Sequence, residues 1–115
     1  MSQCIDLQRI QETSDGDVEF EQELIEMYLE DANEHVQAIG QCISDGDVTQ
    51  LSRAAHTLKG SSANIGAVKV QEAAYKLETT AHSGDLGAAS GILTEIKEAL
   101  TETDTAYKDY LSSAG

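Results

Sequence analysis

The sequence predicts an all-α protein: an up-down-up-down antiparallel four-helix bundle with a short extra N-terminal helix. Three observations favour this fold class. The 115 residues include no Pro and no Trp, and only 4% are aromatic, a composition that favours helix over sheet. Apolar residues recur at alternating steps of three and four, which is the helical period. A short turn sequence recurs between these periodic stretches. We expect a single domain over residues 1–115.

The recurring turn sequence separates the expected helices. Residues 14–18 and 44–48 both read Ser-Asp-Gly-Asp-Val, and residues 82–86 are a looser version. In each, the Gly can take the left-handed conformation that ends one helix, and the Asp after it can cap the next. Calcium loops are a poorer interpretation, because an EF-hand needs oxygen ligands at alternate positions through twelve residues, closed by Glu.

The first half of the chain is expected to form three helices. Residues 6–12 predict a short leading helix that covers one end of the bundle. Residues 18–44 predict a long helix whose acidic residues form a solvated face. Its apolar stripe consists of Ile25, Leu29, Ala32, Val36, Ile39 and Ile43. Residues 48–65 predict the next helix. Its stripe consists of Leu51, Ala55, Leu58, Ser62 and Ile65.

The second half is expected to form two more helices. Residues 68–82 carry one stripe, made of Val70, Ala74, Leu77 and Ala81. Residues 86–111 carry the last stripe, made of Leu86, Ala89, Leu93, Ile96, Leu100, Thr103, Tyr107 and Tyr110. Four amphipathic helices joined by short loops predict neighbours that run antiparallel.

Charge excludes several functions. Twenty-one acidic residues against 7 basic ones give a net charge of −14 and a pI near 4.2, so nucleic acid and anionic membrane surfaces are repelled. No apolar run is long enough to span a membrane, and the N-terminus does not resemble a signal peptide. We therefore expect a cytoplasmic monomer.

Cys4 and Cys42 are expected to be reduced thiols, with Cys4 near a frayed terminus.

One helix face is not explained by folding. His56, Lys59, Gly60 and Ala63 stand at i, i+3, i+4 and i+7 and share a face beside the core stripe. His56 is therefore expected to be at least partly in solvent. A glycine inside a helix costs about 1 kcal/mol relative to alanine. One physical use for a missing side chain at position 60 is to let a partner backbone or a bulky group approach the imidazole closely.

Charge distribution points to the same face. Residues 1–47 contain 13 acidic side chains and one basic one, whereas residues 53–76 contain four basic side chains against Glu72 alone. A partner that presents carboxylates would be steered to this positive segment. The candidate partner-binding residues are Arg53, Gly60, Ala63, Lys69 and Lys76.

Residues 55–67 read Ala-His-Thr-Leu-Lys-Gly-Ser-Ser-Ala-Asn-Ile-Gly-Ala. This segment, together with the four helices, resembles the histidine-containing phosphotransfer (HPt) domains of multistep two-component phosphorelays. The resemblance implies a carrier that accepts a phosphoryl group from a receiver-domain aspartate or a kinase and passes it to another response-regulator receiver. It makes His56 the phosphoacceptor, Lys59 the cation that stabilises phosphate, Gly60 the clearance for the partner and Gly66 the turn into the next helix.

The resemblance also brings in Glu78, because family members often place Gln or Glu on the following helix near the histidine. His56 lies ten residues before Gly66 and Glu78 twelve after it, so in an antiparallel pair their heights nearly coincide. A carboxylate there could orient the ring, fix its tautomer and leave the other nitrogen free to attack.

The chemistry agrees with a carrier. A neutral imidazole can attack phosphorus without a separate base, and phosphoryl transfer needs mainly alignment and charge neutralisation. The sequence shows no nucleotide-binding loop, so we expect no kinase activity and no cofactor of its own, with Mg²⁺ supplied by the receiver. His35 and His82 lack such surroundings, and no metal site is expected.

Two other classes of function stay open. One is a non-catalytic helical adaptor that uses the same face, and the other is an enzyme such as a histidine-dependent phosphatase or a kinase fragment.

Overall fold

The computed structural model describes residues 4–114, and these residues form five helices and no strand. The helices are α1 (Leu7–Ser14), α2 (Val18–Asp45), α3 (Val48–Ile65), α4 (Val68–Ser83) and α5 (Leu86–Ala114). The all-α fold class is therefore confirmed. Helix α1 ends two residues later than the sequence predicts, and α5 ends three residues later. None of the described helices is long and apolar enough to cross a membrane.

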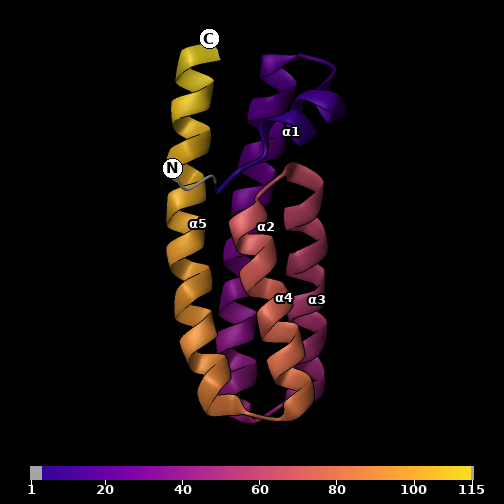
Figure 1. Ribbon diagram of the computed structural model, residues 1–115, viewed down its shortest axis with the longest axis vertical. Coiled ribbons are helices and arrows are strands. Elements are labelled where there is room, and N and C mark those ends of the chain that lie inside the picture. Colours follow the sequence, from indigo (N-terminus) through magenta and orange to yellow (C-terminus); the bar gives the residue numbers. More distant parts are fainter. Residues whose placement is uncertain (1–3, 115) are drawn as a thin grey trace.

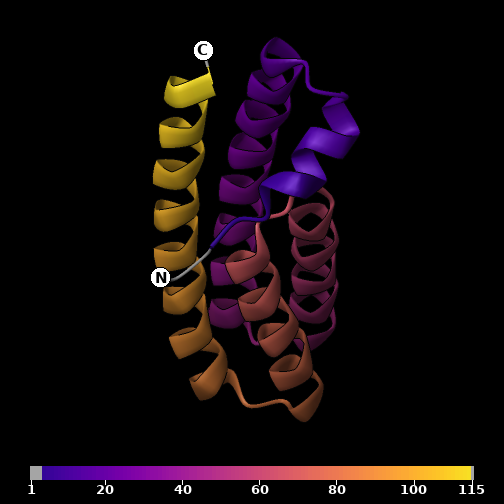
Figure 2. The ribbon, with the colours of Figure 1, turned by 45° about the horizontal axis from the view of Figure 1, so that its top comes forward.

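The helices form an elongated antiparallel bundle of 44 × 25 × 18 Å (Figure 1). The two long helices, α2 and α5, extend past the end of the hairpin formed by α3 and α4. Helix α3 packs most extensively on α4, and α1 lies across the end of the bundle beside α2 and α3 (Figure 2). The α3–α4 hairpin consequently presents a continuous outer face made by two neighbouring helices.

The turns follow the expected chemistry. Helices α2, α3 and α4 each end at a glycine in the left-handed conformation, namely Gly46, Gly66 and Gly84. The Asp17 and Asp47 side chains accept hydrogen bonds from the backbone N–H groups at the starts of α2 and α3. These caps set where α3 begins and so fix which of its residues face outward.

Gly66 has a second role that the sequence does not reveal. The backbone N–H of Asp6 donates to the Gly66 carbonyl at 2.6 Å, and the Lys69 N–H donates to the Cys4 carbonyl at 3.3 Å. A Cβ atom at Gly66 would collide with the Asp6 backbone oxygen. The segment before α1 is thus docked on the α3–α4 turn, and Cys4 is buried. Cys4 is therefore packed and not frayed, whereas the fraying expected of the terminus itself falls on residues 1–3, which lie outside the described residues.

The core contains polar groups that tie the helices together. Glu21 is fully buried and accepts hydrogen bonds from the hydroxyls of Ser14 and Tyr110, each at 2.6 Å. Glu21 therefore departs from the solvated acidic face expected of α2. The Tyr107 hydroxyl donates to the Ile65 carbonyl at the end of α3. Such satisfied polar contacts specify how α1, α3 and α5 are positioned against their neighbours.

Candidate functional site

His56 lies near the middle of α3, on the outer face of the α3–α4 hairpin. Its neighbours Ala55 and Leu58 are fully buried, so the helical period turns position 56 to the edge of the core. The His56 side chain is 66% exposed. The predicted exposure of this imidazole is therefore observed.

Glu78 on α4 joins His56 to Lys59. One carboxylate oxygen, Oε2, lies 2.9 Å from His56 Nδ1, and the other, Oε1, accepts a hydrogen bond from Lys59 Nζ at 2.7 Å. The Glu78 and Lys59 side chains are 17% and 27% exposed, so the pair is better shielded from water than the imidazole. The contact expected from the register of the two helices is present.

Electrostatics determines how the ring is held. The hydrogen bond from Lys59 lowers the pKa of Glu78 below its ordinary value of 4.5, partial burial opposes this, and the His56 contact adds to the lowering. Glu78 is therefore ionised near neutral pH and has no proton to donate. His56 Nδ1 must therefore be the donor in this contact, and in a neutral imidazole that donates from Nδ1 the lone pair is on Nε2.

Tyr75 adds a residue that the sequence reasoning missed. The Lys59 ammonium lies 5.4 Å from the centroid of the Tyr75 ring, within the range of a cation–π contact. The Tyr75 side chain is largely exposed. Tyr75 precedes Glu78 by three residues on α4, and this spacing is the signal that could have placed both on one face.

Gly60 lies on an open part of the surface. A Cβ atom built there would meet nothing within 4 Å, so the missing side chain is not required by packing inside the protein. Arg53 is exposed one turn before His56. Ala63 is half-buried, and its carbonyl accepts a hydrogen bond from Arg9. Arg53, Gly60 and Ala63 thus lie along the same helix as His56.

The structure does not bring Lys69 and Lys76 together with His56. Both lie on the flank of α4 that faces α5, where Lys69 pairs with Glu102 and Lys76 with Glu95. The Glu102 hydrogen bond raises the pKa of Lys69. The net positive charge of residues 53–76 is therefore partly neutralised by carboxylates of α5. The remaining cations of this segment, Arg53 and Lys59, are on α3, the helix that carries His56.

Other candidate groups do not form a second site. His35 contacts Asp31 on the same helix, and His82 lies 3.5 Å from the Ser52 hydroxyl. Within residues 4–114, no group of three or more His, Cys, Asp or Glu side chains is arranged to hold a metal ion.

The fold and the site define a helical bundle that presents one exposed histidine, held at Nδ1 by a carboxylate of the neighbouring helix. The model of the Hpt domain family matches residues 23–106, a range that contains His56, Lys59, Gly60 and Glu78. The chain belongs to the Hpt domain family. Members of this family carry phosphoryl groups on histidine between two-component signalling proteins, and the resemblance seen in residues 55–67 is confirmed.

Individual relatives agree with this membership. The phosphorelay intermediate protein rdeA of Dictyostelium discoideum is 27% identical over 97 residues, which cover 84% of this chain. The match spans only 38% of the length of that relative.

Solved structures show the same fold. Histidine-containing phosphotransfer protein B from Pseudomonas aeruginosa aligns with a TM-score of 0.88 and 20% identity, and the alignment covers 98% of each chain. The maize protein ZmHP2 aligns with a TM-score of 0.85 and 19% identity over 95% of this chain and 83% of the maize chain.

Proposed function

We propose that this chain is a phosphorelay intermediate in which His56 accepts a phosphoryl group from a receiver-domain aspartate, or from a kinase, and transfers it to another response-regulator receiver. The observation that carries the proposal is the contact between His56 Nδ1 and Glu78. It holds an exposed imidazole in one orientation and leaves Nε2 as the nitrogen for attack.

The proposed transfer step follows from this arrangement. The Nε2 lone pair attacks the phosphorus of an aspartyl phosphate, and the bond between phosphorus and the aspartate oxygen breaks. The phosphoryl group is then on Nε2, the aspartate leaves as a carboxylate, and Nδ1 keeps its proton. Glu78 stabilises the positive charge that develops on the ring. Delivery to a second receiver is the reverse of this step with a different aspartate.

Lys59 is proposed to stabilise the phosphoryl group. Its ammonium is bound to Glu78, the same carboxylate that contacts His56, so the flexible Lys59 side chain starts close to the imidazole. A charge-assisted contact of this kind contributes about 1.5–3 kcal/mol. Lys59 therefore supplies part of the charge neutralisation on which phosphoryl transfer depends.

Partners complete the proposed reaction. A receiver docks over Arg53, Gly60 and Ala63, where the open surface at Gly60 admits its backbone close to His56. The receiver supplies Mg²⁺, and a sensor or hybrid histidine kinase supplies the phosphoryl group. We propose that the chain acts in the cytoplasm as a monomeric, stoichiometric carrier without kinase activity.

Mass spectrometry after incubation with a phosphorylated receiver tests the proposal. The sample is kept at neutral to basic pH because phosphohistidine is acid-labile. We expect one added phosphoryl group, located on His56, and the same gain in a His82→Gln control. Binding of the receiver with no gain in mass would indicate an adaptor, and release of inorganic phosphate with no adduct would indicate a phosphatase.

A further inference from the structure

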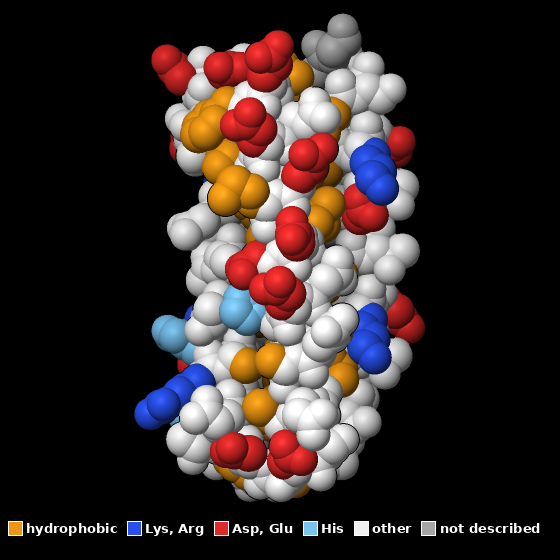
Figure 3. Space-filling view, turned by 180° about the vertical axis from the view of Figure 1, so that it is seen from behind, with side chains coloured by type: hydrophobic (Ala, Val, Ile, Leu, Met, Phe, Trp, Pro, Cys, Tyr) orange, Lys and Arg blue, Asp and Glu red, His pale blue; other side chains and the backbone are white. Residues whose placement is uncertain are grey.

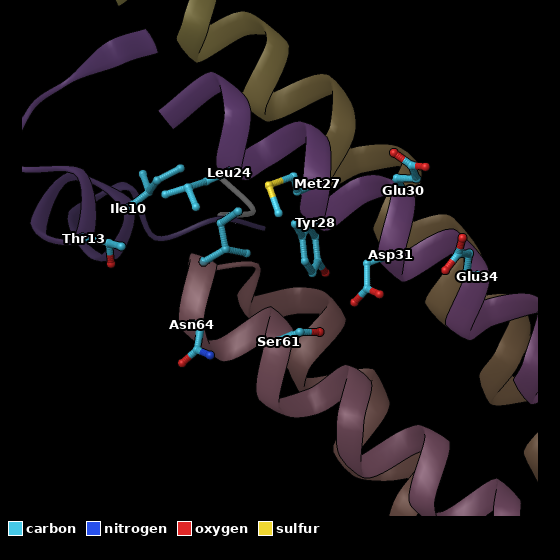
Figure 4. A pocket seen from close by; sticks show the side chains of 11 residues that line it. Ile10, Thr13, Leu24, Met27, Tyr28, Glu30, Asp31, Glu34, Ser61 and Asn64 are labelled. Atoms are coloured by element: carbon cyan, nitrogen blue, oxygen red, sulfur yellow. The ribbon is translucent and has the colours of Figure 1, made fainter. Parts of the chain in front are cut away.

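A groove of about 480 Å³ lies between α1, α2 and α3 (Figure 4). The apolar part of its lining is made by Ile10, Leu24, Met27, Tyr28 and Ile65. Met27 is 67% exposed although it is a large apolar side chain. An open apolar groove of this kind can receive an apolar side chain from a partner.

The groove has an acidic edge on one side. Glu30, Asp31 and Glu34 follow one another along α2 and are all exposed. The opposite wall, on α3, is formed by the uncharged side chains of Ser61 and Asn64. The space-filling view shows apolar side chains gathered on this face with acidic ones beside them (Figure 3). We call Glu30, Asp31 and Glu34 the acidic lip.

The groove and the His56 site lie next to each other along α3. Ser61, which lines the groove, follows Gly60 directly and stands five positions after His56, about 7.5 Å along a helix. A typical protein partner buries about 800 Å² of each surface, which is large enough to cover both the groove and the imidazole. A receiver that reaches His56 across Gly60 therefore also covers the groove.

The two ends of this surface have opposite charge. At the His56 end, Arg53 and Lys59 outnumber Glu78, which pairs with Lys59, and the acidic lip is at the groove end. The cationic end attracts the aspartate site of a receiver, whereas the lip attracts Lys and Arg and repels Asp and Glu. Such an arrangement sets the orientation of a partner and penalises partners whose charges are reversed.

We propose that the acidic lip selects which receivers exchange phosphoryl groups with this chain. The selected receiver inserts an apolar side chain into the groove and carries Lys or Arg next to it, opposite Glu30, Asp31 and Glu34. This inference rests on the proposed function of His56 and specifies the partner of that site.

The expected effect is mainly on the rate of association, because the lip is exposed. Charges at the edge of an interface change the association rate and its salt dependence more than they change dissociation. Reversing all three charges is expected to slow transfer from a cationic receiver at least tenfold at low ionic strength. The difference should shrink in high salt, where the Debye length falls to about 3 Å.

The experiment compares two triple variants with equal change in net charge. The lip variant is Glu30→Lys, Asp31→Lys and Glu34→Lys. The control variant is Glu72→Lys, Glu98→Lys and Asp109→Lys, which changes exposed acids on α4 and α5. The probe is a phosphorylated receiver domain with three Lys or Arg beside the apolar side chain that enters the groove, together with a version in which these three are Glu.

We expect the lip variant to be slowed with the cationic receiver, the control variant to resemble the wild type, and the reversed receiver to restore transfer to the lip variant. Equal slowing of both variants, or no rescue, would overturn the proposal. A double Glu30→Gln and Glu34→Gln variant, which only removes charge, should be slowed less than the lip variant.

A small phosphoryl donor separates this inference from the proposed function. Phosphoramidate needs no docking surface, so it should label His56 equally in the wild type and the lip variant. If the wild type and the lip variant are labelled equally by phosphoramidate and also accept phosphoryl groups equally fast from the receiver, the role of the acidic lip is refuted and the role of His56 is not. Absence of labelling at His56 in the wild type refutes the phosphoacceptor role.

Discussion

Replacing Glu78 tests whether a single carboxylate prepares both His56 and Lys59. Glu78→Ala removes the acceptor for His56 Nδ1 and the ion-pair partner of Lys59 together. Glu78→Gln keeps an amide oxygen that can accept from Nδ1 but removes the charge. The two variants therefore separate orientation of the ring from electrostatics.

The magnitude follows from the two contacts. A hydrogen bond contributes about 0.5–1.5 kcal/mol net, and more when one partner is charged. Loss of the Nδ1 contact leaves both tautomers of His56 accessible and lets the ring turn. A loss of about 1.4 kcal/mol at the transition state corresponds to tenfold in rate. We expect Glu78→Ala to slow phosphoryl uptake about tenfold and Glu78→Gln to slow it by less.

The assay has a kinetic and a spectroscopic part. Phosphoryl uptake from a phosphorylated receiver gives the rates, with Glu72→Ala as a matched control for removal of an α4 carboxylate. Nitrogen NMR of the imidazole reports which ring nitrogen carries the proton. In the wild type the proton should be on Nδ1, and in Glu78→Ala the two tautomers should mix. Unchanged uptake and an unchanged tautomer in Glu78→Ala would refute the reasoning.

The pH dependence of stability gives an independent check. Because Lys59 lowers the pKa of Glu78 below 4.5, the folded state binds this proton less readily than the unfolded state. The stability gained from the ionised carboxylate is fully present above about pH 4.5 and is lost as pH falls through the lowered pKa. The difference in unfolding free energy between wild type and Glu78→Gln should therefore shrink in acid. A constant difference across this range would show that the ion pair contributes nothing.

Three further predictions concern the same hairpin. Lys59→Ala should slow phosphoryl transfer roughly ten- to a hundredfold, because about 1.5–3 kcal/mol of stabilisation at the phosphoryl group is lost. Circular dichroism should show an unchanged fold. An unchanged transfer rate would make Lys59 a structural residue. Gly60→Leu should raise the melting temperature, because Leu gains nearly 1 kcal/mol of helix propensity in open space, yet weaken receiver binding measured by calorimetry. A less stable variant that transfers normally would contradict this. Gly66→Ala should lower the free energy of unfolding, measured with denaturant, by more than Gly46→Ala does. Both substitutions strain a residue with positive φ, but only a Cβ at position 66 meets the Asp6 carbonyl. Equal decreases in the free energy of unfolding would show that this collision does not matter.

Local patterns predicted most of the fold. The Asp-Gly-Asp turns set the boundaries of α2 and α3 because capping and left-handed glycine depend on neighbouring residues alone. The Glu78 contact was also predictable, since register in an antiparallel pair follows from distance to the hinge at Gly66. These inferences need no knowledge of how helices rotate against distant partners.

The features that the sequence did not predict depend on contacts between distant segments. Lys69 and Lys76 appeared to extend the positive surface, but the carboxylates that pair with them are on α5. Glu21 appeared to belong to a solvated face, but the donors that satisfy it come from α1 and α5. In each case the partner lies on another helix, and the rotation of that helix decides whether a charge is exposed, paired or buried.

Two-step transfer through His56 tests the central claim most directly. A phosphorylated receiver is mixed with this chain and with a second, unphosphorylated receiver, and label on all three is followed at basic pH. In the wild type, label should appear first on His56 and then on the second receiver. In His56→Gln both steps should be lost while the receivers still bind. Label that reaches the second receiver through His56→Gln at the wild-type rate would contradict the account.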